Sequence, residues 1–188
     1  MLKRLAVHSG GTMRFARCML LLLLFFIVFR IIVSPSSVFA WSGKVVKVTD
    51  GDTITVLTEG KQKKVRLYGI DCPEYQQPHW QEASRVTRQI VLGQTVDINP
   101  IDIDPYGRTV ALVWQREILL NVELVRLGLA WVYPQFCTTD WPCHQMEELQ
   151  IHAKEGRVGL WSDDRPVPPW KWKRSHPNVY QRLSNVSL

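Results

Sequence analysis

The chain has no acidic side chain in its first forty residues and almost no net charge in the rest. Five basic residues stand in that acid-free segment: Lys3, Arg4, Arg14, Arg17 and Arg30. They account for +5 of the formal charge of +6, so residues 41–188 carry a balance of only +1. The body therefore lacks the positive surplus that attracts polyanions non-specifically, and any site for an acidic partner must be local.

Internal repeats and low-complexity tracts are also absent from the 188 residues. The composition is 46% hydrophobic and 21% charged, which excludes a disordered or fibrous chain. A length of this order suits one ordinary domain and leaves little room for a second. The sequence therefore predicts one globular domain and its flanking segments.

The N-terminal segment has the order of features found in a secretory signal peptide. Basic residues come first, an uncharged run rich in Leu and Phe follows over 18–29, and Val38-Phe39-Ala40 places small residues before a cleavage point after Ala40. A retained membrane anchor is the alternative, but Arg30 interrupts the apolar run short of the roughly 20 residues that a spanning helix needs. We predict that residues 1–40 are a signal peptide and that the protein is exported, periplasmic or secreted; it contacts the membrane only if this segment is retained.

Few cysteines remain after this segment: Cys72, Cys137 and Cys143. The second and third close the short segment CTTDWPC, and disulfides persist outside the cytoplasm. We predict a Cys137–Cys143 disulfide with Cys72 free, although an odd number of thiols also allows a bridge between chains. A zinc site is disfavoured because the spacings between these cysteines and the histidines fit no zinc pattern.

Hydrophobic alternation and turn residues predict an α+β domain that is mainly a β-barrel. The expected strands are 43–48, 53–57, 63–70, 95–101 and 108–114. The expected helices are 80–92, 119–129 and 146–156. Five strands with a helix after the third match a five-stranded OB-fold barrel with three helices, over residues 41–161. Residues 162–188 form a Pro/Trp-rich tail in which we expect little regular structure.

Three short segments carry the ionisable groups that indicate chemistry. They are DGDT (50–53), RLYGIDCPE (66–74) and DPYGR (104–108). Asp52 and Asp71, with a backbone carbonyl near Cys72, are oxygen ligands of the kind that hard divalent cations prefer. Arg66 and Arg108 offer planar forks of donors suited to phosphate.

Glu74 stands three residues after Asp71 and is a candidate general base for a water molecule. Together the segments predict a phosphodiesterase. Strict strand alternation would place Arg66 and Asp71 on opposite faces, so they converge only if the strand bends, and Gly69 is the natural place. Taken singly, each segment is more often structural than catalytic.

The motifs VTDGDTITV, VRLYGIDCPE, DPYGRTVA and LNVELVRLGLAWVY, in this order, resemble the staphylococcal nuclease (thermonuclease) family. The resemblance covers roughly residues 42–161. It implies an OB-fold barrel, a calcium ion and endonucleolytic hydrolysis of DNA and RNA. It also implies roles for residues at matching positions: Arg66 and Arg108 on the scissile phosphate, Asp52 and Asp71 on calcium, Glu74 as the base.

The resemblance further implies that Tyr106 lies beside the nucleotide and that the backbone carbonyl of Cys72 reaches the metal. The familiar member of the family has Thr where this chain has Cys72, and the change brings a thiol that can oxidise close to the site. The loop after Glu74 is shorter and less basic here, and the CTTDWPC insert and the tail have no counterpart.

Two functions remain in competition at this stage. The first is an exported, monomeric, calcium-dependent nuclease acting on DNA, RNA or both. The second is a nuclease-like barrel that binds nucleic acid or protein without catalysis. The intact set of two arginines and three acids favours the enzyme, because some staphylococcal-nuclease-like repeats in larger proteins have lost such residues.

Overall fold

The structure, a computed structural model, describes residues 41–177, so the predicted signal peptide lies outside the described residues. The strands are β1 (Trp41–Val48), β2 (Thr53–Thr58), β3 (Lys61–Leu67), β4 (Ile70–Asp71), β5 (Thr95–Ile103), β6 (Thr109–Gln115), β7 (Ile118–Leu119) and β8 (Trp131–Val132). The helices are α2 (Trp80–Val91), α3 (Leu120–Arg126), α4 (Asp140–Glu155), the short 3₁₀ turn η1 (Gly159–Ser162) and α5 (Pro169–Ser175). Over this part of the chain, no helix has the length and apolar character to span a membrane.

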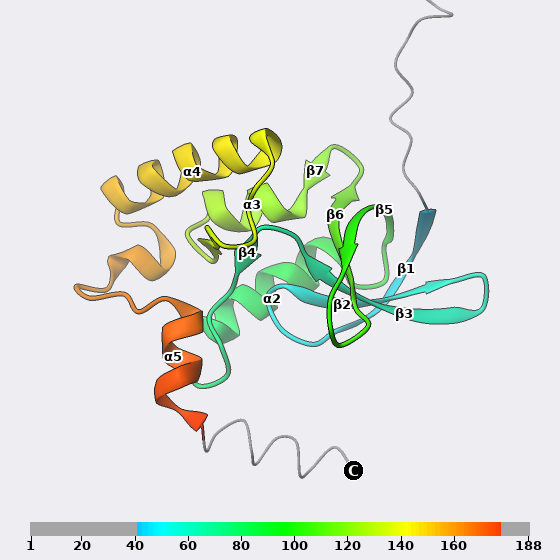
Figure 1. The fold of residues 1–188 in the computed structure, drawn as a ribbon, viewed down its shortest axis with the longest axis horizontal. Helices are drawn as coiled ribbons and strands as arrows, with labels where there is room; N and C mark the ends of the chain where they lie inside the picture. Colours follow the sequence, from blue (N-terminus) through cyan, green and yellow to red (C-terminus); the bar gives the residue numbers. More distant parts are fainter. Residues whose placement is uncertain (1–40, 178–188) are drawn as a thin grey trace, which may run out of the picture. The chain divides into compact units, whose positions relative to one another are not determined.

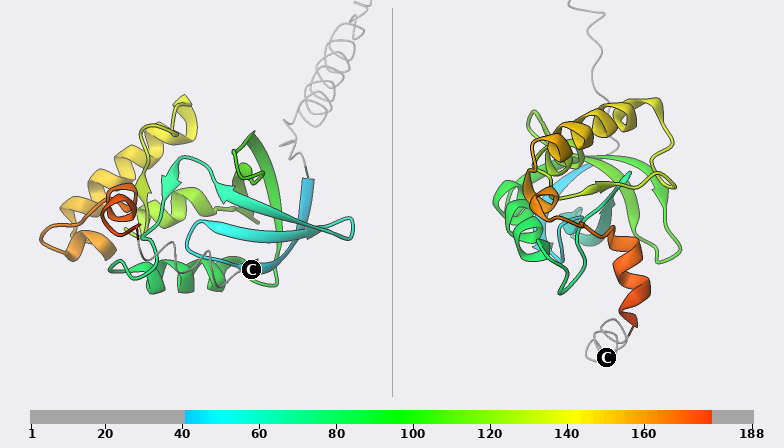
Figure 2. Two further views of the ribbon diagram at one scale, coloured as in Figure 1. Left: turned by 60° about the horizontal axis from the view of Figure 1, so that its bottom comes forward. Right: turned by 90° about the vertical axis from the view of Figure 1, so that its left-hand side faces the viewer.

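Five strands close into a barrel in the order β3-β2-β1-β5-β6 (Figure 1). All neighbours in this order are antiparallel, and the barrel closes where β3 and β6 pair in parallel. Figure 2 shows the long β2–β3 hairpin at one end and α4 and α5 at the other. The predicted α+β architecture with a five-stranded OB-fold barrel is therefore confirmed.

Branched aliphatic side chains fill the barrel, because alternate residues of each strand point inward. The fully buried ones include Val45, Ile54, Val56, Val65, Ile98 and Val113. The helices cover this core with side chains such as Ala83 of α2 and Leu124 of α3. Each large buried side chain contributes about 1.5–3 kcal/mol, so the barrel is a stable scaffold for buried charges nearby.

Buried Asn121 ties α3 to the strands that carry the site. Its Oδ1 accepts a hydrogen bond from the Val113 N–H at 3.1 Å. Its Nδ2 donates to the carbonyl oxygens of Tyr68 and Ala111 at 2.9 and 3.2 Å. Because Tyr68 stands in the turn between β3 and β4, this amide fixes the direction in which the chain leaves the barrel.

The tail differs from the prediction. The expectation of little regular structure after Trp161 is wrong for residues 169–175, which form α5. Sequence reasoning treated the prolines as helix breakers, yet Pro169 occupies the first helical turn, where its fixed φ and missing N–H carry no penalty. The helix α4 also begins earlier than the predicted residue 146, with a kink at Trp141.

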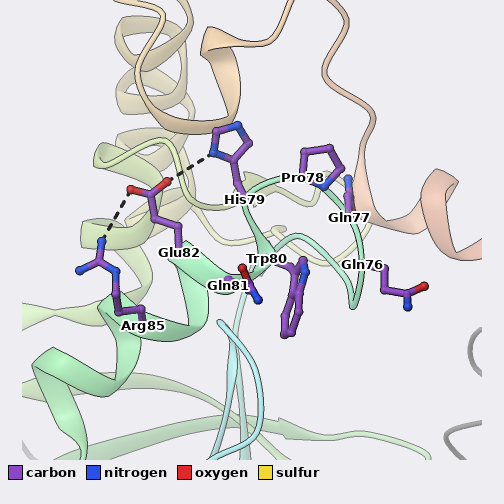
Figure 3. A pocket seen from close by; sticks show the side chains of 8 residues that line it. All are labelled: Gln76, Gln77, Pro78, His79, Trp80, Gln81, Glu82 and Arg85. Carbon is purple, nitrogen blue, oxygen red and sulfur yellow. Dashed lines mark hydrogen bonds and ion pairs between the residues drawn. The ribbon is translucent and has the colours of Figure 1, made fainter.

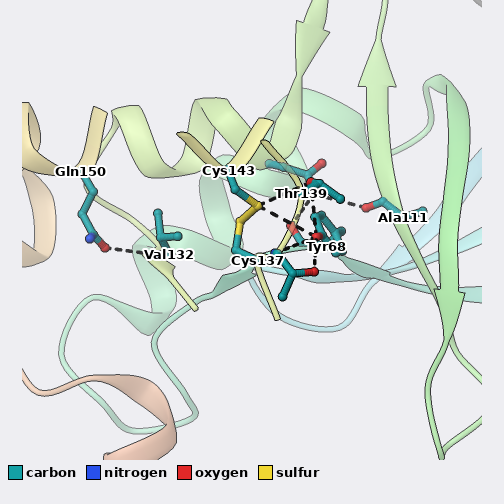
Figure 4. Close-up of a disulfide and its surroundings, with 9 residues drawn as sticks. Tyr68, Ala111, Val132, Cys137, Thr139, Cys143 and Gln150 are labelled. Atoms are coloured by element: carbon teal, nitrogen blue, oxygen red, sulfur yellow. Dashed lines mark hydrogen bonds between the residues drawn. A yellow bond between two sulfur atoms is a disulfide. The ribbon is translucent and has the colours of Figure 1, made fainter. Parts of the chain in front are cut away.

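The predicted disulfide joins Cys137 and Cys143 across a Cα–Cα distance of 5.6 Å, and Cys72 is a free cysteine, as expected (Figure 4). The bridge lies against the turn between β3 and β4. A Cβ atom on Gly69 would come within 2.6 Å of Cys137 Sγ. The hydroxyl of Tyr68 accepts a hydrogen bond from the Thr138 N–H at 3.0 Å. The CTTDWPC segment is thus fastened to the turn that separates Arg66 from Asp71.

Removal of this bridge by the double change Cys137→Ala, Cys143→Ala is expected to lower the free energy of unfolding by about 2 kcal/mol. The loop is short, so the bridge restrains the unfolded chain only modestly. Thermal unfolding of the oxidised protein and the double variant measures the effect as a fall of about 6 °C in Tm. An unchanged Tm would show that the bridge does not stabilise the fold.

Candidate active site

The break between β3 and β4 brings Arg66 and Asp71 together. Strand β3 ends at Leu67, the turn contains Gly69 at φ 75°, and β4 resumes at Ile70. Arg66 Nη2 contacts Asp71 Oδ1 and also donates to the Ile70 carbonyl oxygen at 3.2 Å. The predicted bend at Gly69 is therefore confirmed, and it resolves the conflict with strict alternation.

Asp52 joins the same group from the turn between β1 and β2. Its Oδ1 contacts Arg66 Nη1 and accepts from the Thr53 hydroxyl at 3.2 Å. Its Oδ2 accepts a 2.6 Å hydrogen bond from the Cys72 N–H, which links the turn to the loop after β4. One guanidinium thus lies between two carboxylates, and we call Asp52, Arg66 and Asp71 the central cluster.

The central cluster holds more acid than one arginine neutralises. Asp52 and Asp71 are only 4% and 6% exposed. Burial raises the pKa of Asp71 above its ordinary value, Arg66 opposes this, and the nearby carboxylate of Glu74 raises it further. Burial also raises the pKa of Asp50, against the lowering effect of Arg66 and, more weakly, Arg108. Another positive charge would stabilise these carboxylates in their ionised form.

The donor chemistry of the central cluster fits a hard cation. Within residues 41–177, no group of three or more His, Cys, Asp or Glu side chains is placed to hold an ion. Asp52 and Asp71 bring two carboxylates to one place and are the pair that could hold a divalent ion, with backbone oxygens and water as its other ligands. The role of the Cys72 carbonyl as a further ligand stays a prediction.

Glu74 lies on the loop between β4 and α2. Its backbone N–H donates to Gln77 Oε1 at 2.9 Å, which fixes the loop after Pro73. Its side chain is 21% exposed, and its Oε1 accepts a hydrogen bond from Lys173 Nζ of α5 at 3.1 Å. Sequence reasoning missed Lys173, since it stands 99 residues away in a tail expected to be irregular.

Arg108 stands immediately before β6, and its charge works to lower the pKa of Asp50, two residues from Asp52 of the central cluster. Arg66 is paired with Val110 in the parallel β3–β6 ladder, so Arg108, two residues earlier, shares the face of Arg66. Its neighbour Tyr106 is 84% exposed, with the ring centroid 5.5 Å from Arg108 Cζ.

Asp104 positions Arg108, a role that the sequence did not assign. Its Oδ1 accepts the N–H groups of Tyr106 and Arg108, both at 2.9 Å. Its Oδ2 accepts Arg108 Nε at 2.5 Å. Partial burial works to raise the pKa of Asp104, but the backbone and side-chain bonds from Arg108 outweigh it and the pKa is lowered. An aspartate four residues before an arginine in a turn was the available signal.

The thiol of Cys72 is buried and does not face solvent. Burial raises the pKa of this thiol well above its ordinary value. Its side chain also packs against Gly51, where an added Cβ would lie 2.8 Å from Sγ. Because the thiolate is the reactive form, the oxidation near the site that the sequence suggested is disfavoured.

A separate hollow of about 710 Å³ contains none of the predicted site residues (Figure 3). It is formed by the loop before α2 and the first turns of that helix. Within this hollow, Glu82 contacts His79 Nδ1 at 3.4 Å and Arg85 at 3.7 Å. The charged side chains that line the hollow are therefore largely paired with one another. We assign no chemistry to it.

Comparison with known proteins is consistent with this geometry. The family profile described as Staphylococcal nuclease homologue matches residues 64–163. An uncharacterised endonuclease of Escherichia coli O157:H7 is 39% identical over 132 residues, which cover 70% of this chain and 84% of that protein. A micrococcal nuclease of Shigella flexneri is 36% identical over 156 residues, covering 76% of this chain and 88% of the relative. An uncharacterised endonuclease of Haemophilus influenzae is 37% identical over 132 residues, covering 70% and 72%.

The chain belongs to the staphylococcal nuclease family. It is a nuclease, a hydrolase of the endonuclease type, built on the OB-fold barrel described above.

Proposed function

We propose that the protein is an exported, calcium-dependent endonuclease that hydrolyses phosphodiester bonds of DNA, RNA or both. The central cluster supports this proposal most strongly, because two buried carboxylates, one from the β1–β2 turn and one from β4, meet at one guanidinium. Glu74 and Arg108 stand on the loops around it. An ion pair with a purely structural role needs only one carboxylate for Arg66. It gives no reason for the second buried carboxylate at the same guanidinium.

Asp52 and Asp71, with the carbonyl of Cys72, would hold calcium. When bound, the ion polarises a phosphoryl oxygen and offsets charge that develops on it. Calcium is preferred over magnesium because two carboxylates, a carbonyl and water form no rigid octahedral cage.

The protein's own residues orient the phosphate and move the proton. Arg66 and Arg108 present planar donors to the phosphate oxygens, and Tyr106 lies beside the nucleotide. Glu74 accepts a proton from the attacking water as the water oxygen bonds to phosphorus and the bond to the leaving oxygen breaks. Both guanidinium groups are held in place before the reaction. Asp104 holds Arg108, and the turn at Gly69 brings the Ile70 carbonyl oxygen to Arg66.

Export is supported by the basic and apolar order of residues 1–40 and by the disulfide, which persists in oxidising compartments. N-terminal sequencing of the protein recovered outside the cytoplasm is expected to begin at Trp41. A sequence beginning at Met1 would instead indicate a retained anchor.

Digestion of single- and double-stranded DNA and RNA by the purified protein tests the proposed activity and defines the substrate. We expect internal cleavage of at least one of these polymers in calcium, because the central cluster and both arginines are in place. A protein that binds these polymers but cleaves none of them in calcium would contradict the proposal and favour the non-catalytic binding module. The same protein is expected to behave as a monomer in solution.

A further inference from the structure

Helix α5 is held against the domain from two sides. Trp170 stacks on Tyr133 with ring centroids 4.5 Å apart and planes at 9°. It also meets Trp131 edge-on at 5.8 Å. Just before the helix, the Val167 carbonyl oxygen accepts a 2.6 Å hydrogen bond from Gln77 Nε2. Aromatic stacking and a hydrogen bond thus fix where the side chains of α5 point.

That placement brings cations of α5 to the edge of the active site. Lys173 follows Trp170 by one helical turn and contacts Glu74 at 3.1 Å, while its side chain is 57% exposed. Arg174 is the next residue and is also exposed. The helix PWKWKRS contains three basic residues and no acid, so it is locally positive although the body as a whole is nearly neutral.

A hollow of about 580 Å³ lies beside these cations. Its lining comes from two segments: Tyr133, Pro134 and Gln135 after β8, and Trp170, Lys173 and Arg174 of α5. This volume is within the range of about 300–1,000 Å³ typical of ligand sites. Aromatic and proline side chains line one part, basic side chains line another, and no acid lines it. A base with its phosphate has the matching chemistry, a flat apolar face and an anion.

We propose that α5 forms a subsite for a nucleotide of a single-stranded substrate beyond the scissile bond, with Lys173 and Arg174 binding its phosphate. This rests on the proposed function, since the subsite adjoins the carboxylate of Glu74. A second phosphate contact holds the strand in register across the central cluster. Lys173 and Arg174 also supply positive charge at the edge of the active site, in a body whose net charge is only +1.

The test is equilibrium binding without cleavage. Fluorescence anisotropy follows a labelled single-stranded DNA of about 12 nucleotides, a length in the range that OB-folds bind, in chelator over a series of salt concentrations. The variant is Lys173→Gln, Arg174→Gln. The matched control, Lys61→Gln, Lys64→Gln, removes the same charge from exposed residues of β3. The β2–β3 turn lies at the other end of the domain from α5 in Figures 1 and 2.

The α5 variant is expected to bind about tenfold more weakly. The slope of log affinity against log salt concentration should be smaller by about 0.7, the value for one phosphate of a single strand that is no longer neutralised. The control should bind like the unchanged protein. Circular dichroism confirms that both variants are folded.

Unchanged binding by the α5 variant, or an equal loss in the control, overturns the subsite. Faster cleavage of the oligonucleotide by the α5 variant in calcium would also overturn it, because α5 would then shield Glu74 rather than bind substrate. A selective loss of binding in a protein that cleaves nothing would support the subsite and contradict the proposed function. The experiment can therefore contradict the α5 subsite without contradicting the proposed endonuclease function, and the reverse.

Discussion

Changing Glu74 to Gln is expected to lower kcat by about 100- to 1,000-fold with little change in the affinity for calcium or substrate. Glutamine keeps the size of the side chain and its loop, which is fixed through the backbone N–H and Gln77. It cannot accept the proton of the attacking water, and general-base catalysis is typically worth about 10²–10⁴ in rate. Single-turnover cleavage in calcium measures the loss.

The matched control for this prediction is Glu82→Gln. Glu82 is an exposed glutamate of α2 that contacts His79 and Arg85 and stands outside the central cluster. It should cleave at the unmodified rate. If Glu74→Gln retains full kcat, the proton acceptor is another group and the assignment of the base is wrong.

The second large effect is expected at Arg66. Arg66→Lys should lower the cleavage rate by about 100- to 1,000-fold, the loss typical of removing one transition-state donor. Two guanidinium nitrogens reach Asp52 and Asp71 separately, and one also reaches the Ile70 carbonyl. A lysine ammonium is a point charge that cannot span these positions or present two parallel donors to a phosphate.

Arg88→Lys is the control for this change. Arg88 is exposed and donates to one carbonyl oxygen, that of Val48, at 2.9 Å, a contact that an ammonium can also make. Its variant should cleave within about threefold of the unmodified rate, as expected for a residue that makes no transition-state contact. Equal, small losses for Arg66→Lys and Arg88→Lys would mean that Arg66 has a structural role alone.

The parts of the fold with local signals could be predicted from the sequence. Alternating β-branched residues separated by Asp-Gly and Glu-Gly turns predicted β2 and its neighbours. Gly69 predicted the break that lets Arg66 meet Asp71, since only glycine adopts a positive φ there without strain. The short spacing of Cys137 and Cys143 predicted the bridge between them.

Long-range contacts and side-chain geometry could not be predicted in the same way. Nothing local to Lys173 points to Glu74, which is 99 residues away, and the tail's prolines concealed a helix. The support that Asp104 gives to Arg108 depends on the shape of one turn. The sharing of one guanidinium by Asp52 and Asp71 depends on how the β1–β2 turn, β3 and β4 meet.

The most direct test of the account is the initial rate of phosphodiester cleavage by the purified protein with calcium, with magnesium and with chelator. Two carboxylates with no rigid cage predict cleavage in calcium, slower cleavage in magnesium and none in chelator. Equal cleavage in chelator, or faster cleavage in magnesium than in calcium, would contradict the assignment of Asp52 and Asp71 to a calcium site.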